Sequence, residues 1–149
     1  MALDNDIDNL ARLPLFAALE PMALRSLAAR AETRLLRAGD RLFRRGEDSD
    51  GGYILAQGSI AVETDDDGRP AAKILHPWTL IGETALIAAT ARPITATARE
   101  PTTVFRIARP VFHGVLEEYP TSALRVRSYF AERLRDISKS LIFAAEPEA

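Results

Sequence analysis

The spacing of apolar side chains divides the chain into three stretches. Over residues 6–31 they recur at three- and four-residue intervals, which predicts a helix over 6–13 and another over 20–31, separated by Pro14. Over residues 33–107 they form short runs between Gly, Asp and Pro, as in strands joined by turns. These runs are Leu35-Leu36, Leu42-Phe43, Tyr53-Ile54-Leu55, Ile60 to Val62, Ile74-Leu75, Ile94 to Ala98 and Thr103 to Ile107. The pattern predicts a mainly β sandwich or barrel with flanking helices.

The helical pattern returns at two places. Residues 82–89 interrupt the strands with a helical composition, and after residue 108 the chain is predicted to stay helical, over 109–118 and from Pro120 to about 143. The stripe of the last helix either packs back on the strands or pairs with a second subunit, and its coiled-coil-like spacing favours a homodimer. The stripe consists of Ala123, Val126, Phe130, Leu134, Ile137 and Leu141.

Composition narrows the class of protein. The chain has 149 residues, 47% hydrophobic and 27% charged, which fits one globular domain over 1–149. Because cysteine is absent, disulfides, thiolate catalysis and cysteine-bound metal are excluded. A net charge of −2 favours no nucleic-acid partner, and no apolar run is long enough to span a membrane. We expect a cytoplasmic protein that binds neither.

Enzymatic chemistry finds no support in the pattern of residues. His76 and His113 fall in different elements, and neither has a glutamate at a metal-binding spacing. The serines lack the context of a nucleophile elbow. The run Asp65-Asp66-Asp67-Gly68 is interpreted as a hairpin turn, because the later glutamate of a calcium loop is missing. We therefore expect a protein without catalytic residues and without a metal site.

One segment combines an anion-binding backbone with two complementary charges. Gly82 precedes a short predicted helix, whose first N–H groups have no partner within the helix and can face an anion. Glu83 could accept hydrogen bonds from a hydroxyl, and Arg92 could pair with a phosphate through its planar fork. A fixed cation beside an acceptor suits a ligand that carries both a phosphate and a sugar hydroxyl. Otherwise Glu83 caps the helix and Arg92 pairs with Glu83.

The order of these features resembles the cyclic nucleotide-binding domain family, from about Leu13 to Phe143. The Gly-Glu-x-Ala-Leu…Arg element, from Gly82 to Arg92, is similar to the phosphate-binding cassette of that family. The upstream residues that resemble the β-roll of the family are Leu15-Phe16, Leu19, Gly39-Asp40, Gly46-Glu47, Tyr53-Ile54-Leu55 and Gly58. The resemblance implies an eight-stranded antiparallel β-roll, a jelly-roll-like double-stranded β-helix. N-terminal helices, a short cassette helix and a long C-terminal helix would flank it.

The resemblance also implies a ligand and its contacts. Glu83 would hold the ribose 2′-hydroxyl of a cyclic mononucleotide, and Arg92 the exocyclic phosphate oxygens. Cyclic AMP is the first expectation and cyclic GMP the alternative. Further candidates are backbone N–H groups of Gly82, Thr84 and Ala85, the strand residue Thr95, and Tyr129, Phe130 or Arg133 as covers for the base. The chain would be a sensor domain without its own output domain, acting on an effector protein that the sequence does not identify.

Two positions depart from the family pattern. Pro93 follows the cassette arginine and has no N–H for the phosphate, and losing such a bond costs about 1.5–3 kcal/mol. The usual glycine ahead of the cassette is missing from His76 to Leu80, where we interpret Trp78 as a packing residue. Pro93 therefore keeps an alternative open, in which the fold binds no nucleotide and acts as a dimeric interaction module.

Overall fold

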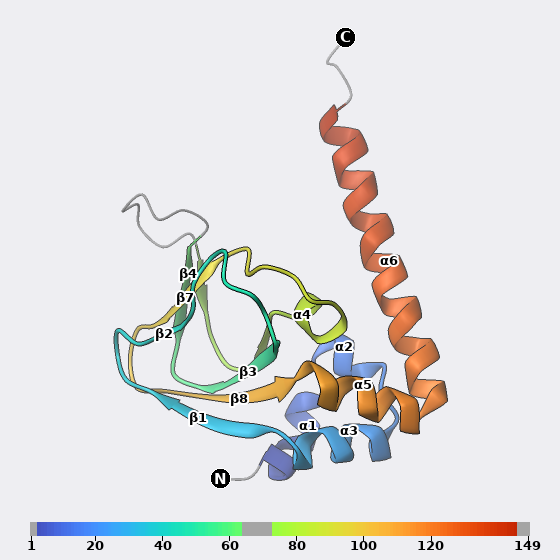
Figure 1. Cartoon of the computed structure of the whole chain (residues 1–149), viewed down its shortest axis with the longest axis horizontal. Coiled ribbons are helices and arrows are strands. Elements are labelled where there is room, and N and C mark those ends of the chain that lie inside the picture. The colour runs from blue at the N-terminus through green and yellow to red at the C-terminus, as the bar shows by residue number, and fades with distance from the viewer. Residues whose placement is uncertain (1–2, 64–72, 146–149) are drawn as a thin grey trace.

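The computed structural model describes residues 3–63 and 73–145, which form two β-sheets with helices gathered at one end (Figure 1). One sheet has the strand order β1-β8-β3-β6 and the other β2-β7-β4-β5, with all neighbours antiparallel. The strands are β1 (Glu32–Leu36), β2 (Arg41–Phe43), β3 (Gly51–Gln57), β4 (Ile60–Glu63), β5 (Lys73–Leu75), β6 (Thr79–Ile81), β7 (Thr95–Ala98) and β8 (Thr102–Ala108). The predicted eight-stranded antiparallel β-roll is confirmed.

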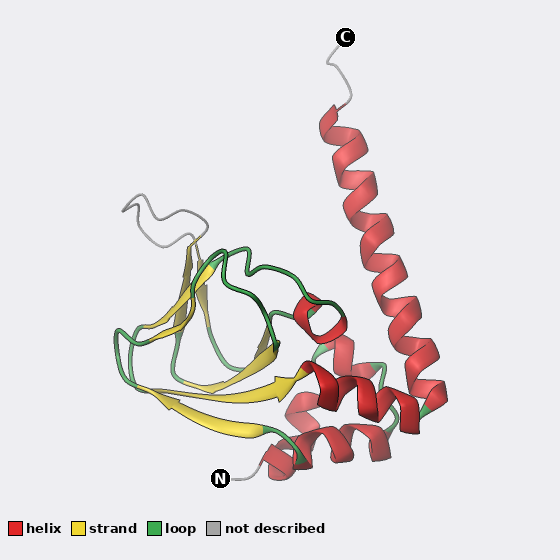
Figure 2. Cartoon of the chain, in the orientation of Figure 1, coloured by secondary structure: helices red, strands yellow, loops and turns green. Residues whose placement is uncertain are grey.

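The helices lie on both sides of the strands in the sequence, yet most of them meet in space (Figure 2). Pro14, Pro21, Pro110 and Pro120 each fall in the first turn of a helix, where a missing N–H leaves no internal bond unmade. The helical elements are η1 (Leu3–Asp6), α1 (Ile7–Leu10), α2 (Pro14–Ala17), α3 (Pro21–Ala29), α4 (Thr84–Ile87), α5 (Arg109–Glu118) and α6 (Pro120–Ala145). Within the described ranges, no helix is long and apolar enough to cross a lipid bilayer.

Two hydrophobic cores share the strands β3 and β8. Alternate side chains of a strand point to opposite faces. Accordingly, Tyr53 and Leu55 pack between the sheets with Val104, whereas Ile54 and Phe105 pack against the helices. Both faces of these strands are therefore buried, which explains their continuous apolar runs. The helical elements consequently rest on the same strands that form one wall of the β-roll.

The N-terminal part of the long helix α6 packs against the rest of the domain. The chain breaks at Tyr119, whose backbone angles (φ −124°, ψ 80°) end α5 before Pro120 starts α6. Ser122 is fully buried and accepts a hydrogen bond of 2.8 Å from the backbone N–H of Glu20, and Val126 is 2% exposed. Side chains from 131 to 136 are exposed, and the helix extends away from the sheets (Figure 1).

Three boundaries differ from the sequence prediction. Pro14 begins α2 instead of separating two helices, because its fixed φ suits the first helical position. The predicted helices over 6–13 and 20–31 are shorter, ending at Leu10 and Ala29. The strand β6 was not predicted from the pattern of apolar residues. The predicted hairpin turn at 65–68 lies outside the described residues.

Candidate functional site

The turn from β6 into α4 depends on Gly82. This residue has a φ of +81°, a backbone conformation that residues other than glycine rarely adopt. A Cβ atom placed on Gly82 would also lie 2.7 Å from Nη1 of Arg92. The carbonyl of Gly82 accepts a hydrogen bond of 3.1 Å from the N–H of Ala85, which closes the first turn of α4. Glycine thus permits both the turn and the close approach of Arg92 to the backbone.

Arg92 is held inside the β-roll by main-chain and ring contacts. Its side chain is 4% exposed, and Nη2 donates a hydrogen bond of 2.8 Å to the carbonyl of Gly51. The guanidinium carbon lies 4.3 Å from the ring centroid of Phe43 and 5.6 Å from that of Tyr53, within the range of cation–π attraction. The Arg92 backbone is fixed as well, because its N–H donates to the carbonyl of Glu47. The strands therefore determine the position of this cation.

One nitrogen of Arg92 is left without a partner. Nη1 is buried and, among the described residues, makes no hydrogen bond. Burial lowers the pKa of Arg92, partly opposed by Tyr53 and by the charge of Asp50. An arginine still keeps its proton in proteins, and a buried donor without a partner carries a large desolvation cost. An anion beside Gly82 would satisfy this nitrogen.

Arg92 takes part in an ion-pair network with Asp50 and Arg106. Nη2 of Arg106 lies 2.6 Å from one carboxylate oxygen of Asp50, while Nη2 of Arg92 lies 3.7 Å from the other. Burial would raise the pKa of Asp50, but the hydrogen bond and charge of Arg106 and the charge of Arg92 lower it. Nη1 of Arg106 also lies 3.2 Å from Glu32. The carboxylate of Asp50 therefore offsets part of the positive charge of both Arg106 and Arg92. It makes no hydrogen bond to Nη1 of Arg92.

Glu83 faces α6 instead of capping α4. Its Oε2 accepts a hydrogen bond of 2.8 Å from the hydroxyl of Tyr129, and its Oε1 lies 2.7 Å from Nε of Arg133. Among the described residues its side chain makes no capping bond to α4. Since Arg92 bonds Gly51 and Asp50, the alternative in which Glu83 caps the helix and pairs with Arg92 is wrong for this structure.

Arg109 ties the cassette to α5. Its Nε donates to the carbonyl of Ala85 at 2.8 Å, and its Nη2 donates to the carbonyl and the hydroxyl of Ser49 at 2.8 and 2.9 Å. His113, one turn further along α5, lies 3.1 Å from the carbonyl of Ile87 through Nε2. The short helix α4 is therefore coupled to the first two turns of α5.

The structure brings five of the six predicted site residues together. Thr84 begins α4, and Ala85 is 3% exposed with its N–H already bonded to the carbonyl of Gly82. Thr95 lies on β7 next to the core residue Ala96. It is 4% exposed, and its Oγ1 accepts a hydrogen bond of 2.9 Å from the N–H of Arg45, so its hydroxyl is already engaged within the chain. The residues brought together are Gly82, Glu83, Thr84, Ala85 and Arg92.

Several residues of the site were missed by sequence reasoning. Phe43 and Tyr53 read as ordinary core positions of strands, and Asp50 as part of a turn. Arg109 carried no signal, because its partners are mainly backbone carbonyls distant in the sequence. Trp78, taken as a packing residue, does lie against the core beneath the helices.

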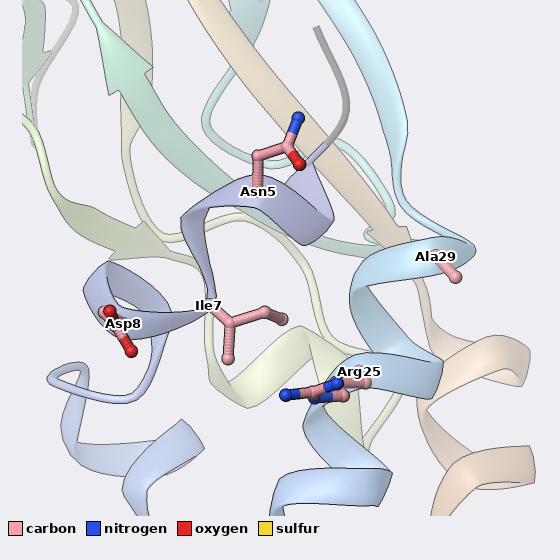
Figure 3. A pocket seen from close by; sticks show the side chains of 5 residues that line it. All are labelled: Asn5, Ile7, Asp8, Arg25 and Ala29. Atoms are coloured by element: carbon pink, nitrogen blue, oxygen red, sulfur yellow. The ribbon is translucent and has the colours of Figure 1, made fainter.

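Other hollows and residue clusters are less organised. A hollow of about 370 Å³ lies at the N-terminal helices, and Figure 3 shows the side chains that line it, those of Asn5, Ile7, Asp8, Arg25 and Ala29. Of these, only Ile7 is partly buried, so this surface lacks the buried, oriented polar group found at Arg92. Over the described ranges, no group of three or more His, Asp or Glu side chains is placed to hold a metal ion.

Comparison with known proteins gives a consistent result. A family model described as the cyclic nucleotide-binding domain matches residues 33–119. A cyclic nucleotide-binding-like protein from Brucella abortus is 41% identical, covers 76% of this chain and 98% of its own, and has a TM-score of 0.70. The N-terminal domain of a transcriptional regulator from Streptomyces coelicolor A3(2) is 30% identical, covers 90% of this chain and 95% of its own, and has a TM-score of 0.81.

A curated enzyme shares part of the same region. Lysophospholipase nte1 of Aspergillus fumigatus is 26% identical over 102 residues, a match that covers 67% of this chain and only 7% of the enzyme. The family model spans more than half of the chain, and it includes the Gly82 turn, Glu83 and Arg92. The chain belongs to the cyclic nucleotide-binding domain family.

Proposed function

We propose that this domain binds a cyclic mononucleotide at the Gly82 turn, with cyclic AMP as the first expectation and cyclic GMP as the alternative. The observation that carries the proposal is the buried Nη1 of Arg92, which has no partner among the described residues and lies close to the backbone of Gly82. A phosphate oxygen would supply the missing acceptor in a charge-assisted hydrogen bond. Glu83 would receive the ribose hydroxyl from the other side.

We propose that the domain is regulatory and is not an enzyme. Ligand binding would change the positions of the helices, and the ligand would not be chemically altered. Leu86 of α4 shares the helical core with Phe112 and Val115 of α5, and Arg109 connects the two helices. If the phosphate draws the residues from Gly82 to Arg92 inward, α5 and the chain break at Tyr119 would therefore move with them. Ligand binding would then shift the equilibrium between two conformations of the helices. The effector that reads this change, like a cytoplasmic location, stays a prediction.

Titration calorimetry with cyclic AMP and cyclic GMP tests the proposal. We expect micromolar binding of one of them. The variant Arg92→Ala removes the proposed charged contact to the phosphate and should weaken binding about a hundredfold. The matched control is Arg44→Ala, since Arg44 is exposed near the end of β2. No heat from either nucleotide at millimolar concentration would reject the proposal.

A second candidate is the interaction module that binds no nucleotide. Two observations favour it: Pro93 offers no N–H to a phosphate, and both oxygens of Glu83 are already engaged by α6. In this case the domain would act through protein contacts alone, and Arg92→Ala would leave its interactions unchanged.

We also propose that α6 forms a homodimer, whichever candidate holds. Leu124 and Leu134 are 63% and 65% exposed on this helix, and pairing with a second helix would remove apolar surface of this kind from water. Light scattering on Leu134→Asp should give half the mass of the wild type. Met22→Asp is the control, because Met22 is 63% exposed on α3. Equal masses for Leu134→Asp and the wild type would remove the helix-pairing proposal.

Nucleic acid is not expected to bind. Gel shifts with DNA at physiological salt should show no specific retardation, and such retardation would contradict this assignment of partners.

A further inference from the structure

The sheet β2-β7-β4-β5 has an outer face that lies away from the helices (Figure 1). Val62 and Ala96 of this sheet point into the core between the sheets, so the residues that alternate with them face outward. Ala61 and Thr97 are paired there, on β4 and β7. A hollow of about 550 Å³ opens over these two small side chains. Arg92, in contrast, is buried inside the β-roll, so the hollow is a separate feature of the molecule.

Three arginines line this hollow, namely Arg41, Arg44 and Arg99. All three are exposed, and among the described residues their guanidinium groups make no hydrogen bond and no ion pair. An arginine keeps its charge at any physiological pH, and its planar fork is suited to a carboxylate. The outer face of the sheet therefore offers a group of cations whose preferred acceptors are not supplied by this part of the chain.

The three arginines form a row along β7. Arg41 lies opposite Thr97 in the pairing of β2 with β7, and Arg99 follows two residues after Thr97. At the other end Arg44 lies about opposite Thr95, because the residue before Arg44 is paired with the residue after Thr95. Two residues of a strand span about 7 Å, so the row has a spacing of about 7 Å and a length of about 13 Å. One small anion cannot contact all three positions.

A buried hydroxyl and two carboxylates complete the lining. Thr95 is 4% exposed, and its Oγ1 accepts the N–H of Arg45, whereas the hydrogen of the same hydroxyl has no acceptor among the described residues. Asp40 and Glu63 also line the hollow, and Oδ2 of Asp40 accepts a hydrogen bond of 2.8 Å from the N–H of Arg37. A polymer that is charged at every unit would meet these carboxylates, but a peptide can place uncharged side chains beside them.

We propose that this face binds an extended acidic segment of a partner protein, with carboxylates at every second residue. Such side chains lie on one face of an extended segment, about 7 Å apart, which is the spacing of the arginine row. Each carboxylate can form charge-assisted hydrogen bonds with one arginine, and the hydroxyl of Thr95 can donate to the carboxylate beside it. This surface does not depend on nucleotide binding, and it provides the domain with a contact for an effector.

Fluorescence anisotropy with a labelled peptide of alternating glutamate and threonine, containing three glutamates, tests both charge and spacing. We expect the wild type to bind this peptide more tightly than a peptide of the same composition whose three glutamates are consecutive. The triple variant Arg41→Gln, Arg44→Gln and Arg99→Gln should bind at least about tenfold more weakly, because each exposed ion pair is worth up to about fivefold in affinity.

The matched control is the triple variant Arg12→Gln, Arg25→Gln and Arg135→Gln, which makes the same change of net charge at exposed positions on the helices. It should bind the alternating peptide within about twofold of the wild type. Equal affinities of the two triple variants would overturn the proposal, and so would a wild type that fails to bind the peptide at millimolar concentration. Equal binding of the alternating and the consecutive peptide would reject the match of spacing.

Reversal of charge separates pairing from loss of folding. Glutamate at positions 41, 44 and 99 should abolish binding of the glutamate peptide and confer binding of an alternating lysine peptide, an exchange that an unfolded variant would not show. Without this exchange, the assignment of the arginines as the contacts is wrong. A single-stranded DNA oligonucleotide is the competing probe. If the wild type binds it more tightly than the peptide and the glutamine variant loses it, the partner is a nucleic acid and the acidic segment is excluded.

Discussion

The two charged residues of the candidate site are held by different parts of the molecule. Arg92 is fixed by the β-roll, through the carbonyl of Gly51 and the ring of Phe43. Glu83 is held by donors from α6, a helix that begins 37 residues later, at Pro120. The cation therefore takes its place when the strands pair, whereas the state of the carboxylate depends on where a helix lies. The proposed regulatory function would use both, the β-roll to recognise the ligand and α6 to report its binding.

The largest loss of stability is expected from adding a side chain at Gly82, next to Arg92. Gly82→Ala combines the cost of a positive φ, about 1–2 kcal/mol, with a steric clash against Arg92 worth about 1–3 kcal/mol. Gly39→Ala is a matched control, because Gly39 has a φ of +92° but no atom within 4 Å of an added Cβ. Urea denaturation should show the larger loss for Gly82→Ala. Equal losses would mean that the approach of Arg92 adds nothing to the cost.

The contact with α6 should be visible in the titration of one phenol. Glu83→Gln removes the negative charge that helps to raise the pKa of Tyr129 to about 12, so the pKa should fall toward its usual range. Because the pKa in the folded protein is raised, the stabilisation is complete below pH about 10 and is lost as the pH rises toward 12.

Tyrosinate absorbance measures this shift, and Tyr129→Phe isolates the signal from Tyr53 and Tyr119. An unchanged alkaline titration in Glu83→Gln would contradict the contact between Glu83 and α6.

A smaller loss of stability is expected from a change in the ion-pair network of the β-roll. Asp50→Asn weakens the network behind Arg92, at a cost of about 1 kcal/mol or less because the carboxylate is 63% exposed. The pKa of Asp50 is lowered in the folded protein, so its contribution is present above pH about 4 and disappears as the pH falls further.

Denaturation of Asp50→Asn and wild type at neutral and acidic pH should show the two stabilities converging in acid. Asp48→Asn serves as a control at another exposed aspartate in the same loop. A difference between Asp50→Asn and wild type that persists unchanged in acid would exclude the network as its source.

The smallest change in stability is expected from replacing Arg92 itself. Arg92→Met loses the hydrogen bond to the carbonyl of Gly51 but also removes a buried charge with an unpaired donor, and these opposing changes should leave the free energy of unfolding within about 1 kcal/mol. Arg109→Met is the contrast, since Arg109 makes three side-chain hydrogen bonds and its loss should cost about 2 kcal/mol. A large loss of stability in Arg92→Met would show that Arg92 holds the fold together and is not kept for a ligand.

Local patterns predicted those parts of the molecule that depend on neighbouring residues. The helix over 109–118 matches α5 to the residue, because Pro110 and the apolar spacing both mark it. The family motif also placed Gly82, Glu83 and Arg92 in one site. Pro14 was misread, because a proline can begin a helix as readily as it ends one.

Predictions failed or were incomplete where an interaction joins distant segments. Thr95 was a candidate ligand contact and stays a prediction, but the sequence did not indicate that its Oγ1 accepts a hydrogen bond from the N–H of Arg45, 50 residues away. Tyr129 and Arg133 were considered as covers for a base, whereas both contact Glu83. Nothing in the sequence pairs position 83 with positions 129 and 133.

The sequence by itself determined the strand-rich class of the fold, its helical ends, its family and the positions of the cassette residues, because these follow from spacing and from a short motif. The tertiary structure decided which charges are satisfied. Among the described residues Nη1 of Arg92 has no partner, since the carbonyl of Gly51 on β3 is taken by Nη2, and Glu83 is occupied because α6 passes α4 after the break at Tyr119. Such balances depend on distances between segments far apart in the chain, which local patterns do not encode.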